Sequence, residues 1–234
     1  MKKISVTKRS KVVETLFDKT KTYSLKDAIA IVKKAPKLKF DETVEVAAKL
    51  NVDPKQSQNA SIRGTVALPN GTGKKVRVAV FCKGAEEKNA KAAGADFIGS
   101  DDLIAKVQGG WADFDVAIAT PEMMKDMAKL GKILGPRGLM PNPKSGTVTL
   151  DTAKAIKEVK AGKIEFKMDK QAGIHAPLGK VSFTDEALYA NALSLIDAIM
   201  SSNTGGLRGH HVKNLFLSTT MGPGIKLDLT EFRK

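Results

Sequence analysis

The sequence is poor in cysteine, in aromatic residues and in long apolar runs, and each scarcity excludes a class of protein. Its one cysteine, Cys82, cannot form an internal disulfide, which is typical of a reducing compartment. No apolar window approaches the roughly 20 residues that a membrane-spanning helix needs. The basic N-terminal segment is followed by no apolar stretch of the kind found in signal peptides. We therefore expect a soluble, cytoplasmic protein with no membrane-spanning segment.

Acidic residues are also scarce relative to basic ones. The 234 residues include 39 Lys+Arg and 25 Asp+Glu, a net charge of +14, and 42% are hydrophobic, as in a globular protein. This charge favours an anionic partner, nucleic acid first and an acidic membrane surface second. Residues 68–159 hold 14 basic and 11 acidic residues, so the two flanks hold the other 25 and 14. A polyanion-binding surface is expected in the flanks.

The low aromatic content, 5% of residues, bears on how a nucleic acid would be bound. Proteins that bind single strands usually stack bases on clustered aromatic side chains, and this sequence has no such cluster. Recognition of a folded RNA through its shape, phosphates and 2′-hydroxyls fits the composition better.

One segment, 129–146, is rich in glycine, proline and basic residues. It reads KLGKILGPRGLMPNPKSG and contains no acidic residue. Glycine and proline at this density exclude one long helix or a central strand. We expect a rigid, exposed, basic loop suited to a phosphate-rich partner. The alternative is a solvated surface loop whose lysines only maintain solubility.

The N-terminal part predicts two helices. Residues 11–17 form a short apolar-periodic piece in a basic context. Ser24 is the expected N-cap of a helix over 25–35, and Asp27 completes a capping box. Pro36 should end this helix because proline cannot continue it.

Strands with one apolar face are predicted at both ends of the chain. Residues 43–52 alternate between apolar and polar, which indicates a half-buried strand, and 61–68 is its expected partner. Beyond the middle of the chain, further elements follow. They are a helix at 151–160 ending at Gly162, strands at 163–169 and 174–183, a helix at 185–201, and two strands around the turn 219–224.

The middle of the chain alternates apolar strands with helices. Strands are predicted at 76–81, 95–98, 115–120 and 146–150, and helices at 85–93, 101–107 and 122–130. This order is typical of a small, mostly parallel α/β sheet with Rossmann-like winding. After the first strand, CKGAEEK has one glycine where a dinucleotide fingerprint needs three. The segment 68–75, LPNGTGKK, lacks the first glycine and the Ser/Thr of a phosphate loop and is expected to be a hinge, so no cofactor is predicted.

The one-faced strands of the two ends need partners, and pairing them satisfies both sets. This predicts an α+β domain with an antiparallel sheet and helices, made of residues 1–67 and 160–234. The α/β domain, residues 68–159, is inserted between them. Hinges are expected near 67–70 and 158–162.

Three stretches, in this order along the chain, resemble one family. KLKFDETVEVAAKLNVD starts at Lys37, the basic segment covers 129–146, and STTMGPG starts at Ser218. Together they resemble the ribosomal L-one family, whose members form the mobile lateral stalk of the large ribosomal subunit. The resemblance spans essentially the whole chain and implies the same two-domain fold.

The resemblance also implies which residues bind RNA. It places RNA contacts at Lys39, Phe40, Thr43, Glu45, Lys49, His175, Lys180, Ser182, Ser218, Thr219, Thr220, Met221 and Gly222. It adds a basic group in the inserted domain at Lys129, Lys132, Arg137 and Lys144. Alternatives remain: Phe40 as a core residue, Glu45 as a cross-strand charge partner, and 218–224 as an ordinary hairpin turn.

The family further implies partners and roles. The partners are the stalk ribosomal RNA, tRNA leaving the exit site, other ribosomal components, and the protein's own messenger, which would mimic the ribosomal site and so be repressed. The free protein is expected to be a monomer. Inserted-domain motion would accompany tRNA release.

Enzymatic chemistry finds little support in the sequence. The three histidines, His175, His210 and His211, have no metal-ligand spacing, and no nucleophile motif is present. Cys82, at the end of an apolar strand, is expected to be a buried small hydrophobe. Two other functions stay open: a nucleotide-dependent enzyme, which NAD or ATP would stabilise, and a DNA-binding protein indifferent to sequence and fold.

Overall fold

The chain divides into two compact units. The computed structural model describes residues 8–36, 38–51, 62–202 and 212–232. The discontinuous unit comprises Met1–Gly73 and Ile164–Lys234, and the inserted unit comprises Lys74–Lys163. Relative to the sequence-based division at 68 and 159, the inserted unit begins six residues later and ends four residues later.

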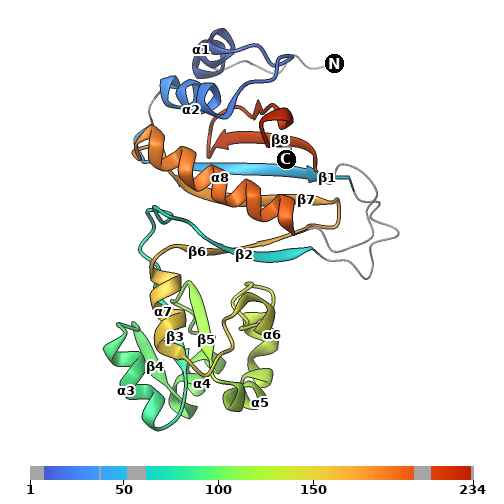
Figure 1. The fold of residues 1–234 in the computed structure, drawn as a ribbon. Coiled ribbons are helices and arrows are strands. Elements are labelled where there is room, and N and C mark those ends of the chain that lie inside the picture. Colours follow the sequence, from blue (N-terminus) through green and yellow to red (C-terminus); the bar gives the residue numbers. More distant parts are fainter. Residues whose placement is uncertain (1–7, 37, 52–61, 203–211, 233–234) are drawn as a thin grey trace, which may run out of the picture. The chain divides into compact units, whose positions relative to one another are not determined.

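The discontinuous unit combines helices with an antiparallel sheet (Figure 1). Its elements are α1 (Lys8–Leu16), α2 (Leu25–Lys34), β1 (Thr43–Leu50), β2 (Arg63–Ala67), β6 (Lys163–Lys167), β7 (Gly173–Lys180), α8 (Asp185–Ser201), β8 (Val212–Thr219), β9 (Ile225–Lys226) and η5 (Leu229–Phe232). The strand order is β7-β1-β8-β9, so strands from the two ends of the chain pair with one another.

One predicted strand pairing is wrong. Residues 61–68 were expected to pair with 43–52, but β1 is flanked by β7 on one edge and β8 on the other. With both edges of β1 occupied, β2 pairs with β6 in a separate two-stranded sheet. Gly64 in β2 lies against the ring of Phe166, where a Cβ would approach to 2.6 Å. Sequence alternation alone could not show which strands are neighbours.

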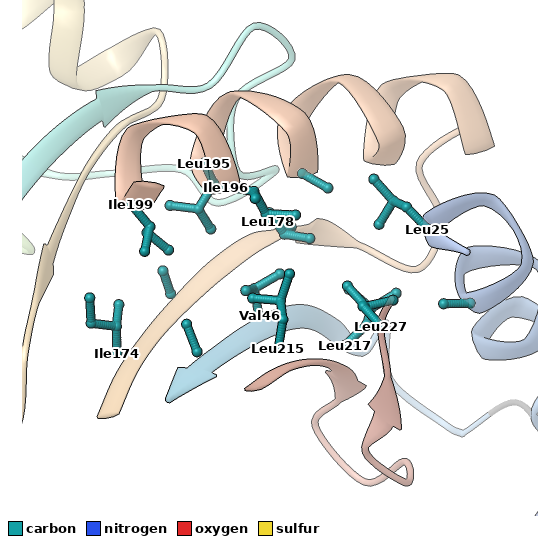
Figure 2. Close-up of a cluster of buried hydrophobic side chains, with 14 of the residues drawn as sticks. Leu25, Val46, Ile174, Leu178, Leu195, Ile196, Ile199, Leu215, Leu217 and Leu227 are labelled. Atoms are coloured by element: carbon teal, nitrogen blue, oxygen red, sulfur yellow. The ribbon is translucent and has the colours of Figure 1, made fainter. Parts of the chain in front are cut away.

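The core of this unit lies between the sheet and two helices. Figure 2 shows Leu25 of α2, Leu178 of β7 and Leu195 of α8 in one apolar layer, and all three side chains are fully buried. Each such leucine contributes about 1.5–3 kcal/mol by leaving water. Along β1 the odd-numbered residues Thr43 to Lys49 are exposed or half-buried, whereas the even-numbered ones are buried. One face of the sheet is therefore the core and the other is open.

The predicted helix cap is confirmed. Ser24 Oγ accepts a hydrogen bond of 3.1 Å from Asp27 N and donates one of 2.7 Å to the Asp27 carboxylate. The helix ends at Lys34, with Ala35 in extended conformation before Pro36, because a residue before proline disfavours the helical region.

The inserted unit is a small α/β fold. Its elements are β3 (Val78–Phe81), α3 (Ala85–Ala92), β4 (Phe97–Gly99), α4 (Asp101–Gln108), β5 (Val116–Ala119), η2 (Pro121–Met123), α5 (Met124–Met127), η3 (Ala128–Leu130), α6 (Gly131–Leu134), η4 (Pro143–Ser145) and α7 (Thr152–Lys160). The three parallel strands have the order β4-β3-β5, and every residue of β3 is buried. Together the two units confirm the predicted fold class.

Two predictions for this unit need correction. The strand expected at 146–150 is reduced to a single parallel bridge between Ala119 and Val148. The helix expected at 122–130 is instead a series of short helical turns that runs on to Leu134. Leu130 and Leu134 are both fully buried in this series, so packing carries the chain past the predicted helix end.

The segment 129–146 is therefore only partly a loop. It begins in helical turns, and its later part is held by internal hydrogen bonds. Asn142 accepts from Lys144 N at 2.9 Å, and Asn142 N donates to Thr147 Oγ1 at 2.8 Å. Gly138 and Gly146 have left-handed φ of 70°, which other residues rarely adopt. These hydrogen bonds and turns support the prediction that the later part of the segment is rigid.

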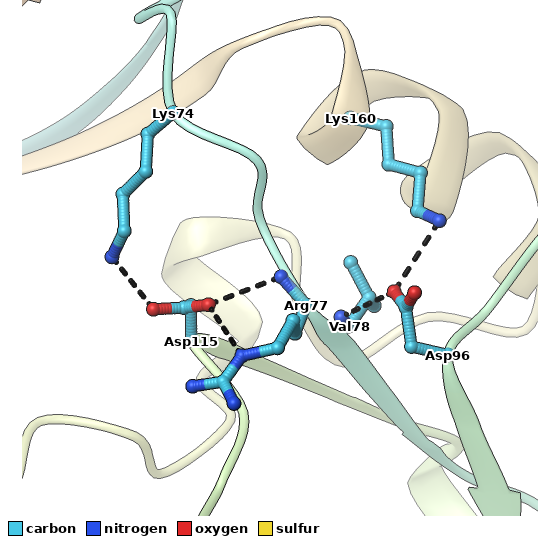
Figure 3. A network of polar contacts seen from close by, with 6 residues as sticks. All are labelled: Lys74, Arg77, Val78, Asp96, Asp115 and Lys160. Carbon is cyan, nitrogen blue, oxygen red and sulfur yellow. Dashed lines mark hydrogen bonds and ion pairs between the residues drawn. The ribbon is translucent and has the colours of Figure 1, made fainter.

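Two aspartates organise the start of the central strand β3 (Figure 3). Asp115 accepts from Lys74 at 2.6 Å, Arg77 N at 3.1 Å and Arg77 Nε at 3.3 Å. The hydrogen bond from Lys74 is the main reason that the pKa of Asp115 falls to about 2. Asp96 accepts from Val78 N at 2.9 Å, which lowers the pKa of Asp96. Adjacent strand starts are thus joined through side chains.

Other predictions concern single residues. Cys82 is fully buried, as predicted. Trp111 packs edge-on against Phe97, with ring centroids 4.8 Å apart. His210 and His211 lie outside the described residues. Among the helices described, none is long and apolar enough to cross a membrane.

Candidate nucleic-acid interface

Three chain segments far apart in sequence meet at one end of the antiparallel sheet. Thr43 N donates to Thr220 Oγ1 at 3.0 Å, and Thr220 N donates back to Thr43 O at 3.1 Å. Lys180 Nζ donates to Thr43 Oγ1 at 2.9 Å. We call the residues gathered here the sheet-end cluster. They are Lys39, Phe40, Thr43, Lys180, Ser182, Thr220, Met221 and Gly222.

Ser182 is anchored to the loop that precedes β1. Its hydroxyl donates to Asp41 Oδ2 at 2.7 Å, and its amide donates to Asp41 Oδ1 at 3.2 Å. Val181 N donates to Glu42 O at 2.9 Å. The loop, the end of β7 and the turn after β8 are therefore held by hydrogen bonds, and the cluster is ordered before any partner binds.

Two large apolar side chains of the cluster face solvent. Phe40 is 53% exposed and Met221 is 65% exposed. The interpretation of Phe40 as a core residue is therefore wrong. Phe40 also borders a cleft of about 420 Å³. The other residues lining the cleft are Val32, Ala35, Leu38, Lys39, Asp41, Glu42, Val181, Ser182 and Thr219.

Four further predicted residues lie on the open face of the sheet. Glu45 is opposite Ser218 on β8, and Ala47 is opposite His175 on β7. Residues that are paired across neighbouring strands share a face, and so do residues two apart in one strand. Glu45, Lys49, Ser218 and His175 therefore extend from the sheet-end cluster along one surface.

The two alternatives for Glu45 can be compared with its surroundings. Glu45 is exposed and, among the described residues, takes part in no ion pair. Lys49, two residues on, donates instead to the carbonyl of Gln171. The interpretation of Glu45 as a cross-strand charge partner therefore finds no support in the described part of the chain.

Thr219 differs from the other predicted residues because its side chain points inward. It is only 7% exposed, and its hydroxyl hydrogen-bonds to Glu42. Strand alternation explains the difference, since Ser218 and Thr220 lie on the opposite side of the backbone from Thr219. The side chain of Thr219 therefore points away from the surface and contacts the buried Glu42 beneath the turn.

Sequence analysis missed Glu42 and Arg9. Glu42 is 7% exposed and accepts from Arg9 Nη2 of α1 at 2.7 Å and from Met221 N at 3.1 Å. The only local signal was an acidic residue just before an alternating strand, which is common and unspecific. Its partners lie 33 and 179 residues away, so only the fold brings them together.

The basic group of the inserted unit is a separate surface. All four of its side chains are exposed. Lys129 lies 3.3 Å from Asp126, one helical turn away. Lys132, Arg137 and Lys144 take part in no ion pair with any other residue that the structure describes. These three cations keep their charge available to an anionic partner.

The fold is that of a two-unit protein, with an α/β unit inserted into an α+β unit. The chain belongs to the ribosomal protein L1p/L10e family, whose model matches residues 31–223. This confirms the family suggested by the three sequence motifs. A member of such a family is a structural protein and not an enzyme.

Two relatives show how far the similarity extends. A "Large ribosomal subunit protein uL1" of Protochlamydia amoebophila is 53% identical over 224 residues, covering 96% of this chain and 94% of the relative. The protein of the same name from Lactobacillus acidophilus is 53% identical over 211 residues, covering 90% and 91%. The similarity includes both units.

Proposed function

We propose that this chain is a cytoplasmic component of the large ribosomal subunit whose discontinuous unit binds ribosomal RNA of the lateral stalk. The RNA would contact the sheet-end cluster and continue along the open face past Glu45, Lys49, His175 and Ser218. Family membership and the names of the two relatives support the assignment to the large subunit.

The observation that carries this proposal is the exposure of Phe40 and Met221 at a hydrogen-bonded sheet end. Apolar side chains at 53% and 65% exposure favour a partner that covers them. The surrounding threonine and serine hydroxyls and Lys180 are groups that bind sugar hydroxyls and phosphates. Because the backbone is already ordered, RNA binding costs little further conformational entropy.

Charge supports the same division of roles. Residues 74–163 hold 16 basic and 11 acidic residues, a balance of +5, which leaves +9 of the net +14 to the discontinuous unit. Phosphate neutralisation by Lys and Arg releases counterions and gives affinity that falls with salt. The discontinuous unit therefore has the larger share of the electrostatic attraction.

The inserted unit has a different proposed partner, the tRNA leaving the exit site. Its three cations without an ion pair among the described residues, Lys132, Arg137 and Lys144, would contact tRNA phosphates. The protein's own messenger would bind the discontinuous unit in place of ribosomal RNA, because a folded messenger element of the same shape meets the same groups. Binding there would repress translation.

The deciding experiment is a titration of the protein with a stalk ribosomal RNA fragment and with a duplex DNA of equal length, each at several salt concentrations. The RNA should bind at least about a thousandfold more tightly and keep this margin as salt rises. Equal binding that collapses with salt for both ligands would mean that net charge alone acts, and the proposed function would fail.

Matched variants locate the surface. Phe40→Ala and Met221→Ala should each weaken the RNA complex by tenfold or more, about the value of one good apolar contact to RNA. Leu150→Ala removes a 71% exposed apolar side chain from the inserted unit and should leave RNA affinity unchanged.

The tRNA proposal has its own pair of variants. Replacing Lys132, Arg137 and Lys144 with alanine should weaken tRNA binding and spare the stalk RNA. Replacing three other exposed lysines of the inserted unit, Lys88, Lys91 and Lys154, removes the same charge and should have little effect. If both triple variants lose tRNA equally, the basic group has no special role.

A further inference from the structure

A buried carboxylate lies beneath the proposed RNA surface. Glu42 is 7% exposed, although its neighbours Asp41 and Thr43 are exposed and half-buried. The Glu42 carboxylate accepts from Arg9 Nη2 at 2.7 Å and from Met221 N at 3.1 Å. A third hydrogen bond comes from the Thr219 hydroxyl. One side chain thus joins helix α1 to the turn after β8.

The carboxylate remains ionised in this setting. Burial would raise the pKa of Glu42, but the hydrogen bonds from Thr219, Arg9 and Met221 N together lower it below the usual value. A buried charge is tolerated where a cation and hydrogen-bond donors compensate the lost hydration, as here. Removing Arg9 would leave the buried Glu42 carboxylate incompletely paired, and removing Glu42 would leave the half-buried Arg9 without its carboxylate.

The residues on either side of Met221 are held by other hydrogen bonds, so within this turn the carboxylate of Glu42 holds the amide of Met221 itself. Thr43 and Thr220 are joined by two hydrogen bonds, and Gly222 N donates to Thr219 O at 3.0 Å. The described hydrogen bond of the Met221 amide is to Glu42 Oε2. The Met221 side chain, 65% exposed, is presented outward from this anchored amide.

We propose that Glu42, held by Arg9 of α1, is a positioning residue for RNA recognition: it fixes the Met221 amide and so sets the direction of the Met221 side chain. This inference rests on the proposed function. It gives helix α1 an indirect part in binding, through Arg9 and Glu42. Glu42 acts through the Met221 amide, because only 7% of its own surface is exposed.

The test combines Glu42 variants with Met221→Ala in stalk RNA titrations. Glu42→Ala should weaken binding by about tenfold to a hundredfold, because it leaves the Met221 amide and Arg9 without their acceptor. Glu42→Gln keeps an oxygen for the amide but loses the charge for Arg9, so its loss should be smaller. In the Met221→Ala background, Glu42→Ala should have almost no further effect.

That last comparison separates positioning from general stability. A carboxylate that only stabilised the fold would weaken binding by the same factor whether residue 221 is methionine or alanine. If Glu42→Ala fails to fold, Arg9→Met provides a second test. Arg9→Met combined with Glu42→Gln should reduce RNA affinity by less than the product of the two factors measured for the single variants, because both remove the same ion pair. Glu231→Ala, which removes a carboxylate that accepts from Leu25 N at 3.2 Å elsewhere in this unit, is the control.

Each outcome has a distinct meaning. If the unaltered protein shows no preference for the stalk RNA, the proposed function fails and takes this inference with it. If the preference is present but Glu42→Ala and Glu42→Gln bind as tightly as the unaltered protein, only the positioning role is overturned. An equal effect in both Met221 backgrounds would overturn it as well.

Discussion

A Cβ atom placed on Gly222 would lie 2.1 Å from Thr219 Oγ1. No real Cβ contact is that short, so the turn after β8 depends on a glycine at this position. The constraint comes from a side chain whose hydroxyl is itself bound to the buried Glu42. The glycine, the threonine and the carboxylate therefore form one structural unit beneath the sheet-end cluster.

Gly222→Ala should displace this turn and weaken stalk RNA binding by about tenfold to a hundredfold, the effect of one to three kcal/mol of strain. Gly224→Ala is the matched control, because the nearest atom to its Cβ would be a ring carbon of Phe216 at 3.9 Å, an ordinary contact. Equal affinities of the two variants would show that the close approach is relieved without cost.

Asn191 is a second buried polar group with a specific task. It is fully buried on α8, donates to Gly71 O at 2.9 Å and to Leu178 O at 2.7 Å, and accepts from Asn70 N at 3.0 Å. Asn191→Leu should destabilise the unit by about 1–3 kcal/mol, because these groups lose their partner without regaining water.

The measurement is urea unfolding followed by circular dichroism, together with hydrogen exchange at the Asn70 amide, which should accelerate. Ser194→Ala, one turn further along α8, removes a hydroxyl bound within the helix to Ala190 O and should change stability little. Unchanged exchange at Asn70 in Asn191→Leu would contradict the assigned role of holding the segment just before the inserted unit.

Asp115 predicts an acid-sensitive inserted unit. Its pKa is about 2 in the folded protein against an ordinary 3.8, so its stabilising contribution is complete above pH 4 and is lost as pH falls toward 2. Because Lys74 and Arg77 are largely exposed to water, we expect about 1 kcal/mol from these pairs.

Asp115→Asn should lower the urea midpoint at pH 7 and lessen its fall between pH 4 and 2. Fluorescence of Trp111 reports this unit alone, since it is the only tryptophan in the sequence and lies in the inserted unit. Asp113→Asn changes the same charge on an exposed neighbour and is the control. A pH dependence that survives in Asp115→Asn would assign the effect to another group.

Cys82 should be unreactive in the folded protein. It is fully buried, and desolvation, followed by the charges of Glu87 and Glu86, raises the pKa of its thiol to about 11. At pH 8 only about a thousandth would be thiolate, the reactive form. Cys82 should react with an aromatic disulfide reagent only at the urea concentrations at which Trp111 fluorescence shows the inserted unit to unfold. As a control, an exposed cysteine introduced by Leu150→Cys in a Cys82→Ala background should react at once in the native protein. Prompt native labelling of Cys82 would show that this strand end opens locally.

Local patterns determined a good part of the architecture. The alternation across 43–52 identified which side chains of β1 are buried, because side-chain direction in a strand follows from the backbone alone. The Ser24 cap and the stop before Pro36 depend on residues within one helical turn. The family followed from three motifs in order along the chain, a matter of residue identity and not of geometry.

Tertiary structure decided the rest. Competition for the edges of β1 assigned them to β7 and β8 and left β2 to pair with β6, an outcome that no single strand's composition encodes. The tertiary fold also brought Arg9, Glu42 and Met221 together across 33 and 179 residues of chain. The sequence by itself thus determined the elements, their apolar faces and the family, because these depend on residue type and short-range geometry. Which faces meet, and which buried charge holds the exposed methionine in place, depends on long-range packing and was decided only by the fold.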